Sequence, residues 1–164
     1  NISMRNITVS TCGVVPRIYE LMNLNLQLTL TISLHAPNDE IRSNTMPINN
    51  KYKIDELLAA CRKYGEKTGR RVSFEYTLIK DVNDSKENAL EFATRLKGMN
   101  AHVNLIPVND VKERGNIKSS KKAILNFQNI LKKNGINATI RRTLGADINA
   151  SCGQLRRLKN RGEN

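Results

Sequence analysis

The stretch Leu28-Thr29-Leu30-Thr31-Ile32-Ser33-Leu34-His35 alternates apolar and polar residues without a break. A strict period of two places successive side chains on opposite faces of a β-strand. All even positions are aliphatic, whereas the odd positions carry hydroxyl groups or an imidazole. The stretch therefore predicts a strand with one face in an apolar core and a polar opposite face.

Strand-like and helix-like segments alternate along the rest of the chain. Further strands are expected at 7–11, 71–79, 102–107 and 136–143. The helices between them are expected to start near Pro16, Asp39, Ile54, Asp84 and Ser119 or Ser120, with Asp84 and Glu87 forming a capping box and Gly135 ending the last helix. The β-α order predicts an α/β fold, a parallel sheet with helices outside it.

A parallel sheet covered on both faces would have strands that are apolar on both faces, and several of these strands are not. Polar residues also recur at Ser73, Glu75, Thr77 and Asn104. Rows of polar side chains on neighbouring strands predict a ligand-lined cavity in a curved or barrel-like sheet. The reactive groups are then expected at the C-terminal ends of the strands and in the loops that follow them.

Length and composition narrow the class of protein. A chain of 164 residues fits one domain but is short for a complete closed barrel of βα units. It begins at Asn1 and reaches a strand almost at once, so upstream sequence is expected. No segment resembles a membrane span or a signal peptide, which predicts a cytoplasmic protein. The three cysteines are Cys12, Cys61 and Cys152, a spacing that suits neither a disulfide framework nor paired CxxC zinc ligands.

The charge is concentrated in the C-terminal third. Of the 27 basic and 15 acidic residues, positions 1–110 carry 14 and 12, whereas positions 111–164 carry 13 and 3. The net charges of the two parts are thus +2 and +10, from the same counts. This asymmetry predicts a polyanionic partner such as RNA, with solubility as the alternative explanation.

A lone thiol lies in the small, polar stretch from Gly145 to Leu155. Cys152 is flanked by Ser151 and Gly153 and follows the pair Arg141 and Arg142, which could favour a thiolate. Cys152 is therefore a candidate nucleophile, and an incidental free cysteine is the alternative interpretation.

Seven motifs follow one another between Asn6 and Leu155. They are Ser10-Thr11-Cys12-Gly13-Val14-Val15-Pro16, Ser33-Leu34-His35-Ala36-Pro37, Met46-Pro47-Ile48-Asn49, Phe74-Glu75-Tyr76, Val82-Asn83-Asp84-Ser85, Asn104-Leu105-Ile106-Pro107 and Cys152-Gly153-Gln154-Leu155. In order and spacing, these motifs closely resemble the RlmN family of radical-SAM enzymes. Members of that family methylate C2 of an adenine in 23S ribosomal RNA and in some transfer RNAs.

The resemblance implies roles for individual residues. Those that would contact S-adenosylmethionine are Ser10, Ser33, Leu34, His35 and Asn109. Cys152 would accept a methyl group and carry it as an S-methylcysteine intermediate. A thiol is required because adenine C2 is not nucleophilic, so ordinary methyl transfer fails and covalent catalysis takes its place.

The sequence also departs from the family pattern. The family holds a [4Fe-4S] cluster with a CxxxCxxC motif, which this chain lacks, so no metal ligand is assigned here. Residues 1–164 are therefore expected to be the C-terminal portion of a partial (βα)6 barrel, its last four strands, without the cluster-binding strands and the accessory domain. Within it, residues 145–164 form the catalytic-cysteine loop and basic tail. Alone, the chain is expected to be inactive.

The implied partners are 23S rRNA, tRNA and an electron donor protein that reduces the cluster, with no membrane. A half-open barrel leaves the edge at Ile7 to Thr11 unpaired, which predicts self-association. Two alternatives remain open: a related family that methylates C8 of the same adenine, and a non-catalytic basic RNA-binding module. An upstream CxxxCxxC motif in the gene would argue against the second.

Overall fold

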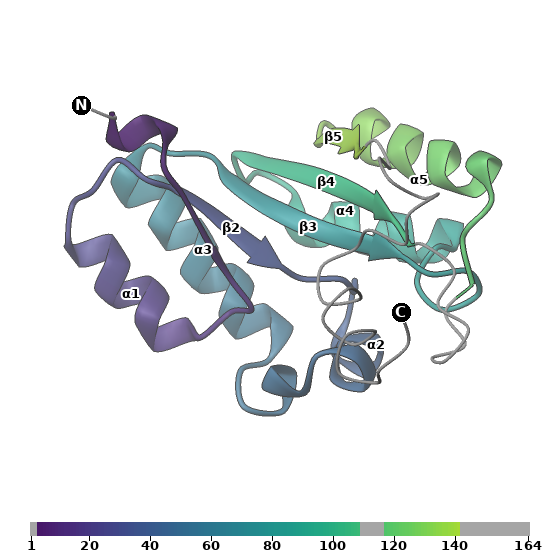
Figure 1. The fold of residues 1–164 in the computed structure, drawn as a ribbon, viewed down its shortest axis with the longest axis horizontal. Helices are drawn as coiled ribbons and strands as arrows, with labels where there is room; N and C mark the ends of the chain where they lie inside the picture. Colours follow the sequence, from purple (N-terminus) through teal and green to yellow (C-terminus); the bar gives the residue numbers. More distant parts are fainter. Residues whose placement is uncertain (1–2, 109–116, 142–164) are drawn as a thin grey trace, which may run out of the picture.

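A computed structural model of the chain describes residues 3–108 and 117–141, and these form one parallel sheet with helices (Figure 1). Its five strands lie in the order β1-β2-β3-β4-β5, and every neighbouring pair is parallel. All five segments predicted as strands form strands, so the sheet has one strand more than the four expected for this portion of the barrel. The strands are β1 (Thr8–Thr11), β2 (Thr29–Ser33), β3 (Val72–Leu78), β4 (Ala101–Pro107) and β5 (Asn137–Ile140).

Helices connect the strands, as the β-α alternation predicted. Parallel neighbours need such crossovers because a strand must return to the same end of the sheet before the next begins. The α-helices are α1 (Val15–Asn23), α2 (Asp39–Thr45), α3 (Ile54–Thr68), α4 (Lys86–Leu96) and α5 (Lys121–Lys133), and the short 3₁₀ helices are η1 (Met4–Asn6) and η2 (Pro47–Asn50). The α/β fold class is confirmed.

The core lies between the helices and one face of the sheet. On β3, Val72, Phe74, Tyr76 and Leu78 are fully buried, at 0% exposure. The Tyr76 ring stacks on Phe92 of α4, with 5.0 Å between ring centroids. Cys61 of α3 is also fully buried in this core.

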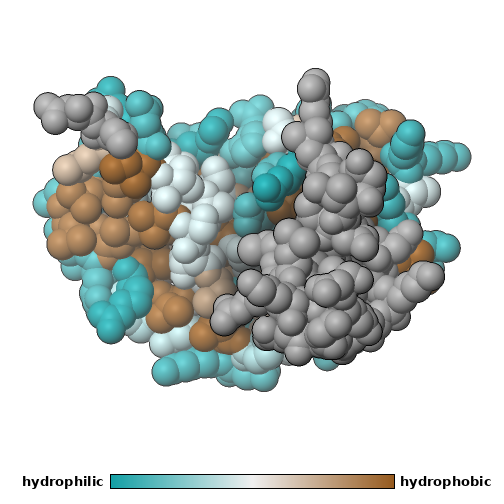
Figure 2. Space-filling view, in the orientation of Figure 1, coloured by the Kyte–Doolittle hydropathy of each residue, from teal (hydrophilic) through white to brown (hydrophobic). Residues whose placement is uncertain are grey.

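The alternating polar residues occupy the other sheet face, where two rows cross the strands in register. The first row is Ser10, Thr31, Ser73, His102 and Asn137, and the second is Ser33, Glu75, Asn104 and Thr139. In the orientation of Figure 1, pale and teal residues extend over the strands (Figure 2). We call this surface the polar face. The helices pack on the opposite face of the sheet, over the core. The prediction of polar rows on neighbouring strands is confirmed.

The structure changes the expected start of α4 and decides between the two serines expected to cap α5. Ser85, not Asp84, caps α4: its Oγ accepts from the Asn88 N–H at 3.1 Å, and Asn88 completes the capping box. Asp84 instead accepts a hydrogen bond from the Asp81 N–H at 3.0 Å, which holds the preceding turn. For α5, the cap is Ser120, whose Oγ accepts from the Ala123 N–H at 3.1 Å.

Within the described ranges, the helices are too short or too polar for any of them to cross a lipid bilayer. The longest, α3, has 15 residues.

Candidate functional site

The candidate site begins at the C-terminal ends of β1 and β2 on the polar face. Ser10 is exposed on β1 and lies level with Thr31 of β2. Ser33, two residues further along β2, is half-buried and its Oγ donates to Glu75 Oε2 at 3.3 Å. The two predicted serines therefore lie on one face of neighbouring strands, where their hydroxyl groups can donate to or accept from a polar ligand.

His35 lies two residues after the end of β2, in a backbone conformation that few residues adopt. Its φ is +59°, in the left-handed region, so β2 stops at Ser33 and does not extend to His35 as expected. The His35 N–H donates to the Glu75 carbonyl at 3.2 Å. Its ring Nδ1 accepts from the Thr77 N–H at 3.1 Å. Because Nδ1 is an acceptor, the proton of a neutral ring is on Nε2, which can donate to a ligand.

Asn83 holds His35 in place from the loop after β3. It is fully buried, and its Nδ2 donates to the His35 carbonyl and to the Thr77 carbonyl, each at 2.8 Å. Its Oδ1 accepts from the Ile79 N–H at 2.8 Å. One amide side chain thus connects the turn after β2 to the end of β3, and it offsets the strain of the left-handed residue.

Burial keeps the His35 ring neutral near pH 7. Desolvation lowers the pKa of His35 below its ordinary value of 6.5, and this effect exceeds the opposing attraction of the Glu75 carboxylate. The buried Arg42 guanidinium lowers the pKa further. A neutral imidazole at this point is a hydrogen-bonding group and not a fixed cation.

Glu75 was expected on the polar face, but the sequence reasoning assigned it no ligand contact. It lies between Ser33 and Asn104 in the second row and is half-buried. A signal was present in the sequence: a single carboxylate in the middle of the otherwise apolar and hydroxyl-bearing strand Val72–Leu78. A carboxylate there could accept from the amino or hydroxyl groups of a ligand.

Leu34 can contribute only through its backbone. Its side chain is fully buried in the core, and its N–H already donates to the Glu75 carbonyl at 3.1 Å. The predicted contact residues Asn109 and Cys152 lie outside the described residues, as does the whole segment 145–164. The described part of the predicted set is therefore Ser10, Ser33, Leu34 and His35.

A buried arginine fixes the loop that follows β1. Arg42 of α2 is fully buried, and its Nη2 donates to the Cys12 carbonyl at 2.7 Å while its Nη1 donates to Asn49 Oδ1 at 3.0 Å. Burial lowers the pKa of Arg42. The adjacent Gly13 has a φ of +100°, and a Cβ there would lie 2.7 Å from Leu57 Cδ2. This packing holds the end of β1, and with it Ser10, against α3.

The two thiols in the described part of the chain do not fit an iron-sulfur cluster. Such clusters take closely spaced cysteine thiolates, and burial raises the pKa of the Cys61 thiol to about 12. Cys12 is exposed at the end of β1. In residues 3–108 and 117–141, no three His, Cys, Asp or Glu side chains come together as metal ligands. We therefore assign no cluster ligand in this part of the chain.

Comparison with known proteins places this arrangement in a family. The family model of the radical SAM superfamily matches residues 1–93, more than half of the chain. The chain therefore belongs to the radical SAM superfamily.

Close relatives carry a more particular name. A probable dual-specificity RNA methyltransferase RlmN from Lachnospira eligens is 60% identical over 156 residues, which is 95% of this chain and 45% of the relative. A protein of the same name from Alkaliphilus oremlandii is 60% identical over 96% of this chain and 46% of its own length. The resemblance to the RlmN family is thus confirmed. The chain spans a little under half the length of the curated relatives it matches.

Solved structures agree on the fold. A radical SAM methyltransferase from Sphaerobacter thermophilus superposes with a TM-score of 0.89 at 51% identity, over 94% of this chain and 45% of that protein. A domain of a pyruvate-formate lyase-activating enzyme from Bacteroides vulgatus reaches a TM-score of 0.65 at 19% identity, over 82% of this chain and 80% of that domain. The second likeness concerns the fold alone.

Proposed function

We propose that this chain is part of a radical-SAM RNA methyltransferase that methylates C2 of an adenine in 23S rRNA and in tRNA. The observation that carries the proposal concerns three residues selected by the resemblance to RlmN: Ser10 and Ser33 lie on the polar face of neighbouring strands, and His35 lies two residues after β2. The relatives named RlmN, at 60% identity, support the same choice.

The polar face would bind S-adenosylmethionine, because its donors and acceptors suit the ribose and amino-acid parts of that molecule. Ser10 and Ser33 supply hydroxyl groups, His35 supplies an Nε2–H donor, and Glu75 supplies an acceptor for an ammonium group. Asn109 would complete this set. When bound, S-adenosylmethionine supplies the methyl group and the radical chemistry.

Cys152 would carry the methyl group to the RNA as S-methylcysteine. Its thiol would be the nucleophile. A nearby cation favours the thiolate form that attacks a methyl group, and Arg141 and Arg142 precede Cys152 in the sequence. Because adenine C2 is not nucleophilic, the methyl group must be held on sulfur when it reacts.

The remaining parts of the enzyme would come from outside these 164 residues. The sequence has no CxxxCxxC motif, and the described residues hold no group of three potential metal ligands. We expect the 164-residue chain by itself to be inactive for this reason, and we place the reaction in the cytoplasm, where RNA is modified.

The test is nucleoside analysis of RNA exposed to the full-length gene product with S-adenosylmethionine and a reductant. We expect 2-methyladenosine in 23S rRNA and tRNA, and none with a Cys152→Ala variant. Formation of 8-methyladenosine would instead assign the chain to the related C8 enzymes. No methylation, together with a gene that lacks CxxxCxxC, would favour the non-catalytic RNA-binding module.

The free edge of β1 supports a further proposal about the chain on its own. Among the described residues, β1 pairs only with β2. Met4 and Ile7, just before β1, and Leu24, at the end of α1, are exposed apolar residues, at 49%, 40% and 62%. Figure 2 shows an apolar area over the part of the molecule where Figure 1 draws α1. An unpaired strand with apolar neighbours is a template for another strand, so the isolated chain is expected to self-associate there.

A further inference from the structure

Helix α5 presents an exposed face without a single acidic residue. Residues 117–141 contain six basic residues and no Asp or Glu. Its buried side chains are Ile124, Phe127 and Leu131, and the opposite side of the helix is exposed. We call this surface the α5 face, and its members are Lys121, Lys122, Leu125, Asn126, Asn129, Lys132 and Lys133.

The other α-helices of the described part of the chain differ in charge pattern. Every one of them, α1 to α4, carries at least one Asp or Glu, and α3 places Asp55, Glu56 and Glu66 among its lysines. Interspersed charges of both signs are typical of a surface that only keeps a protein soluble. The α5 face lacks this mixture, so solubility alone does not account for it.

The positions of the lysines argue for an external anion. Lys132 and Lys133 lie in the last turn, where a cation stabilises the helix dipole. Lys121 and Lys122 lie in the first turn, where the dipole is positive and no acidic residue is present. This N-terminal pair therefore works against helix stability, and an anion bound along the face would relieve that repulsion.

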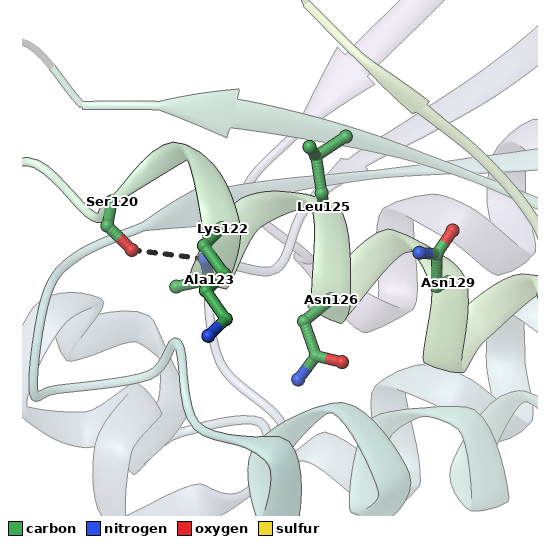
Figure 3. A pocket seen from close by; sticks show the side chains of 6 residues that line it. All are labelled: Ser120, Lys122, Ala123, Leu125, Asn126 and Asn129. Carbon is green, nitrogen blue, oxygen red and sulfur yellow. Dashed lines mark hydrogen bonds between the residues drawn. The ribbon is translucent and has the colours of Figure 1, made fainter.

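Residues along the first part of α5, from Ser120 to Asn129, are suited to binding phosphate and ribose groups. Ser120, Lys122, Ala123, Leu125, Asn126 and Asn129 line a hollow on α5 (Figure 3). In Figure 3 the side chains of Lys122 and Asn126 extend to the same side of the helix. Amide and ammonium groups are common partners of phosphate oxygens and sugar hydroxyls, which position a nucleic acid without reading its sequence.

The α5 face lacks an aromatic group for stacking. The one aromatic residue of the helix, Phe127, is buried at 1% exposure. Binding of single strands relies on such stacking platforms. The chemistry of the face therefore fits the backbone of a folded RNA better than the bases of an unpaired one.

We propose that the α5 face binds the phosphate-ribose backbone of the folded RNA substrate, independently of sequence. This inference rests on the RNA substrate proposed above and adds a surface for it that lies outside the polar face. The two lysine pairs are eleven residues apart, which is about 16 Å at 1.5 Å per residue. The face is thus long enough to contact several phosphates of one helix.

The test compares two quadruple variants of equal net charge in the full-length protein. The α5 variant replaces Lys121, Lys122, Lys132 and Lys133 with Gln. The control variant also introduces four Gln residues, at Lys51, Lys53, Lys86 and Lys97, which are exposed outside α5. Binding of unfractionated tRNA is measured by fluorescence anisotropy between 50 and 200 mM KCl. Circular dichroism checks that both proteins are folded, and a quadruple Lys→Arg variant at the α5 positions keeps the charge.

Each lost phosphate contact reduces the slope of log K against log salt by about 0.7 to 0.9. We therefore expect the α5 variant to lose about three units of slope and at least tenfold in affinity at 100 mM KCl. The control and the Lys→Arg variant should keep the parental slope to within about one unit. Equal losses in both Gln variants, an unchanged α5 variant, or a parent protein that does not bind tRNA would each overturn the proposal.

The same proteins separate this inference from the proposed reaction. A parent that binds tRNA through α5 but forms no methyladenosine would refute the reaction and leave the surface intact. A parent that forms 2-methyladenosine while the α5 variant binds normally would refute the surface alone.

Discussion

At the scale of single residues, the candidate site depends on how His35 is held. Its backbone is left-handed, and its N–H, carbonyl and Nδ1 atoms all bond to β3 or to the loop after it. The only ring atom left for a ligand is Nε2. A histidine fixed in this way offers one directed donor, which suits recognition of a polar ligand more than proton transfer.

The first prediction concerns the stability of the chain toward acid. Burial lowers the pKa of His35 in the folded state, so the unfolded chain takes up a proton first as the pH falls through 6.5. The free energy of unfolding should therefore decrease from pH 7.0 to pH 5.5, by at most about 1.4 kcal/mol per pH unit for one histidine.

Urea denaturation of the parent and of His35→Asn measures this effect. Asn tolerates the left-handed conformation and can accept from the Thr77 N–H, so the variant should fold and show a smaller decrease. Burial also lowers the pKa of His102, the other histidine. His102→Asn is thus the matched control. An identical pH dependence in the parent and in His35→Asn would contradict a neutral, buried His35.

The second prediction concerns Asn83, whose role is to position His35. Replacement by Ala would leave the Ile79 N–H and two carbonyl groups without their partner in a fully buried place. Each such loss is costly, so Asn83→Ala should destabilise the chain by about 3 kcal/mol. Asn126→Ala on the exposed side of α5 should change the stability by less than about 0.5 kcal/mol.

The tautomer of His35 gives a readout that general destabilisation would not change. In ¹⁵N-labelled protein carrying His102→Asn, the remaining ring should be protonated at Nε2 and not at Nδ1. A ring protonated at Nδ1 would show that the bond from the Thr77 N–H is absent, and the arrangement of the site would then be wrong.

At the scale of elements, periodicity predicted the order of strands and helices because strands such as β3 and β4 alternate buried and half-buried residues. The even positions of the stretch that begins at Leu28 are buried from Leu28 to Leu34, as their alternation required. The end of that strand was not predictable, because His35 is turned by contacts with residues 40 or more positions away. Sequence patterns report local geometry, and these contacts are not local.

The cap of α4 shows a second reason why the sequence did not predict every detail: two adjacent residues could both serve as the cap. Asp84 and Ser85 are both good capping residues, and the sequence does not say which one bonds to the helix. In the structure Asp84 bonds to the Asp81 N–H, and Ser85 is left to cap. The burial of Arg42 was also not predictable from the sequence. Charged residues are rarely fully buried, and the Cys12 carbonyl that accepts its hydrogen bond lies 30 positions earlier.

The third prediction follows from this cap. Ser85→Ala should destabilise the chain by about 1 kcal/mol, because it removes the acceptor for the Asn88 N–H. Glu87→Ala, which removes the other member of the expected capping box, should cost only a few tenths of a kcal/mol through the helix dipole. Thermal or urea unfolding of the two variants measures the difference. A larger loss of stability in Glu87→Ala than in Ser85→Ala would contradict the Ser85 cap and favour the capping box of Asp84 and Glu87.

At the scale of the whole molecule, the described sheet has two edges and does not close on itself. Strand β1 forms one edge and β5 the other, while the helices cover the opposite face from the polar rows. The polar rows predicted this asymmetry from sequence alone. The solved methyltransferase that superposes on this chain is longer, and the chain covers 45% of it.

The fourth prediction tests the β1 edge. The isolated 164-residue chain should form dimers or larger species in light scattering, and Ile7→Lys should shift it toward the monomer, because a charge blocks pairing at the edge. Leu125→Lys, on α5, is the control: Leu125 is similarly exposed, at 52%, but lies far along the chain from β1. A monomeric parent chain would contradict the proposed association.

The most direct test of the central claim is the chemical state of Cys152 in the full-length protein. The protein is purified from cells that contain S-adenosylmethionine and digested. Mass spectrometry should then show one added methyl group on the peptide that includes Cys152. The peptides with Cys12 and Cys61 should be unmodified. An unmodified Cys152 in an enzyme that still forms 2-methyladenosine would contradict the assignment of this thiol as the methyl carrier.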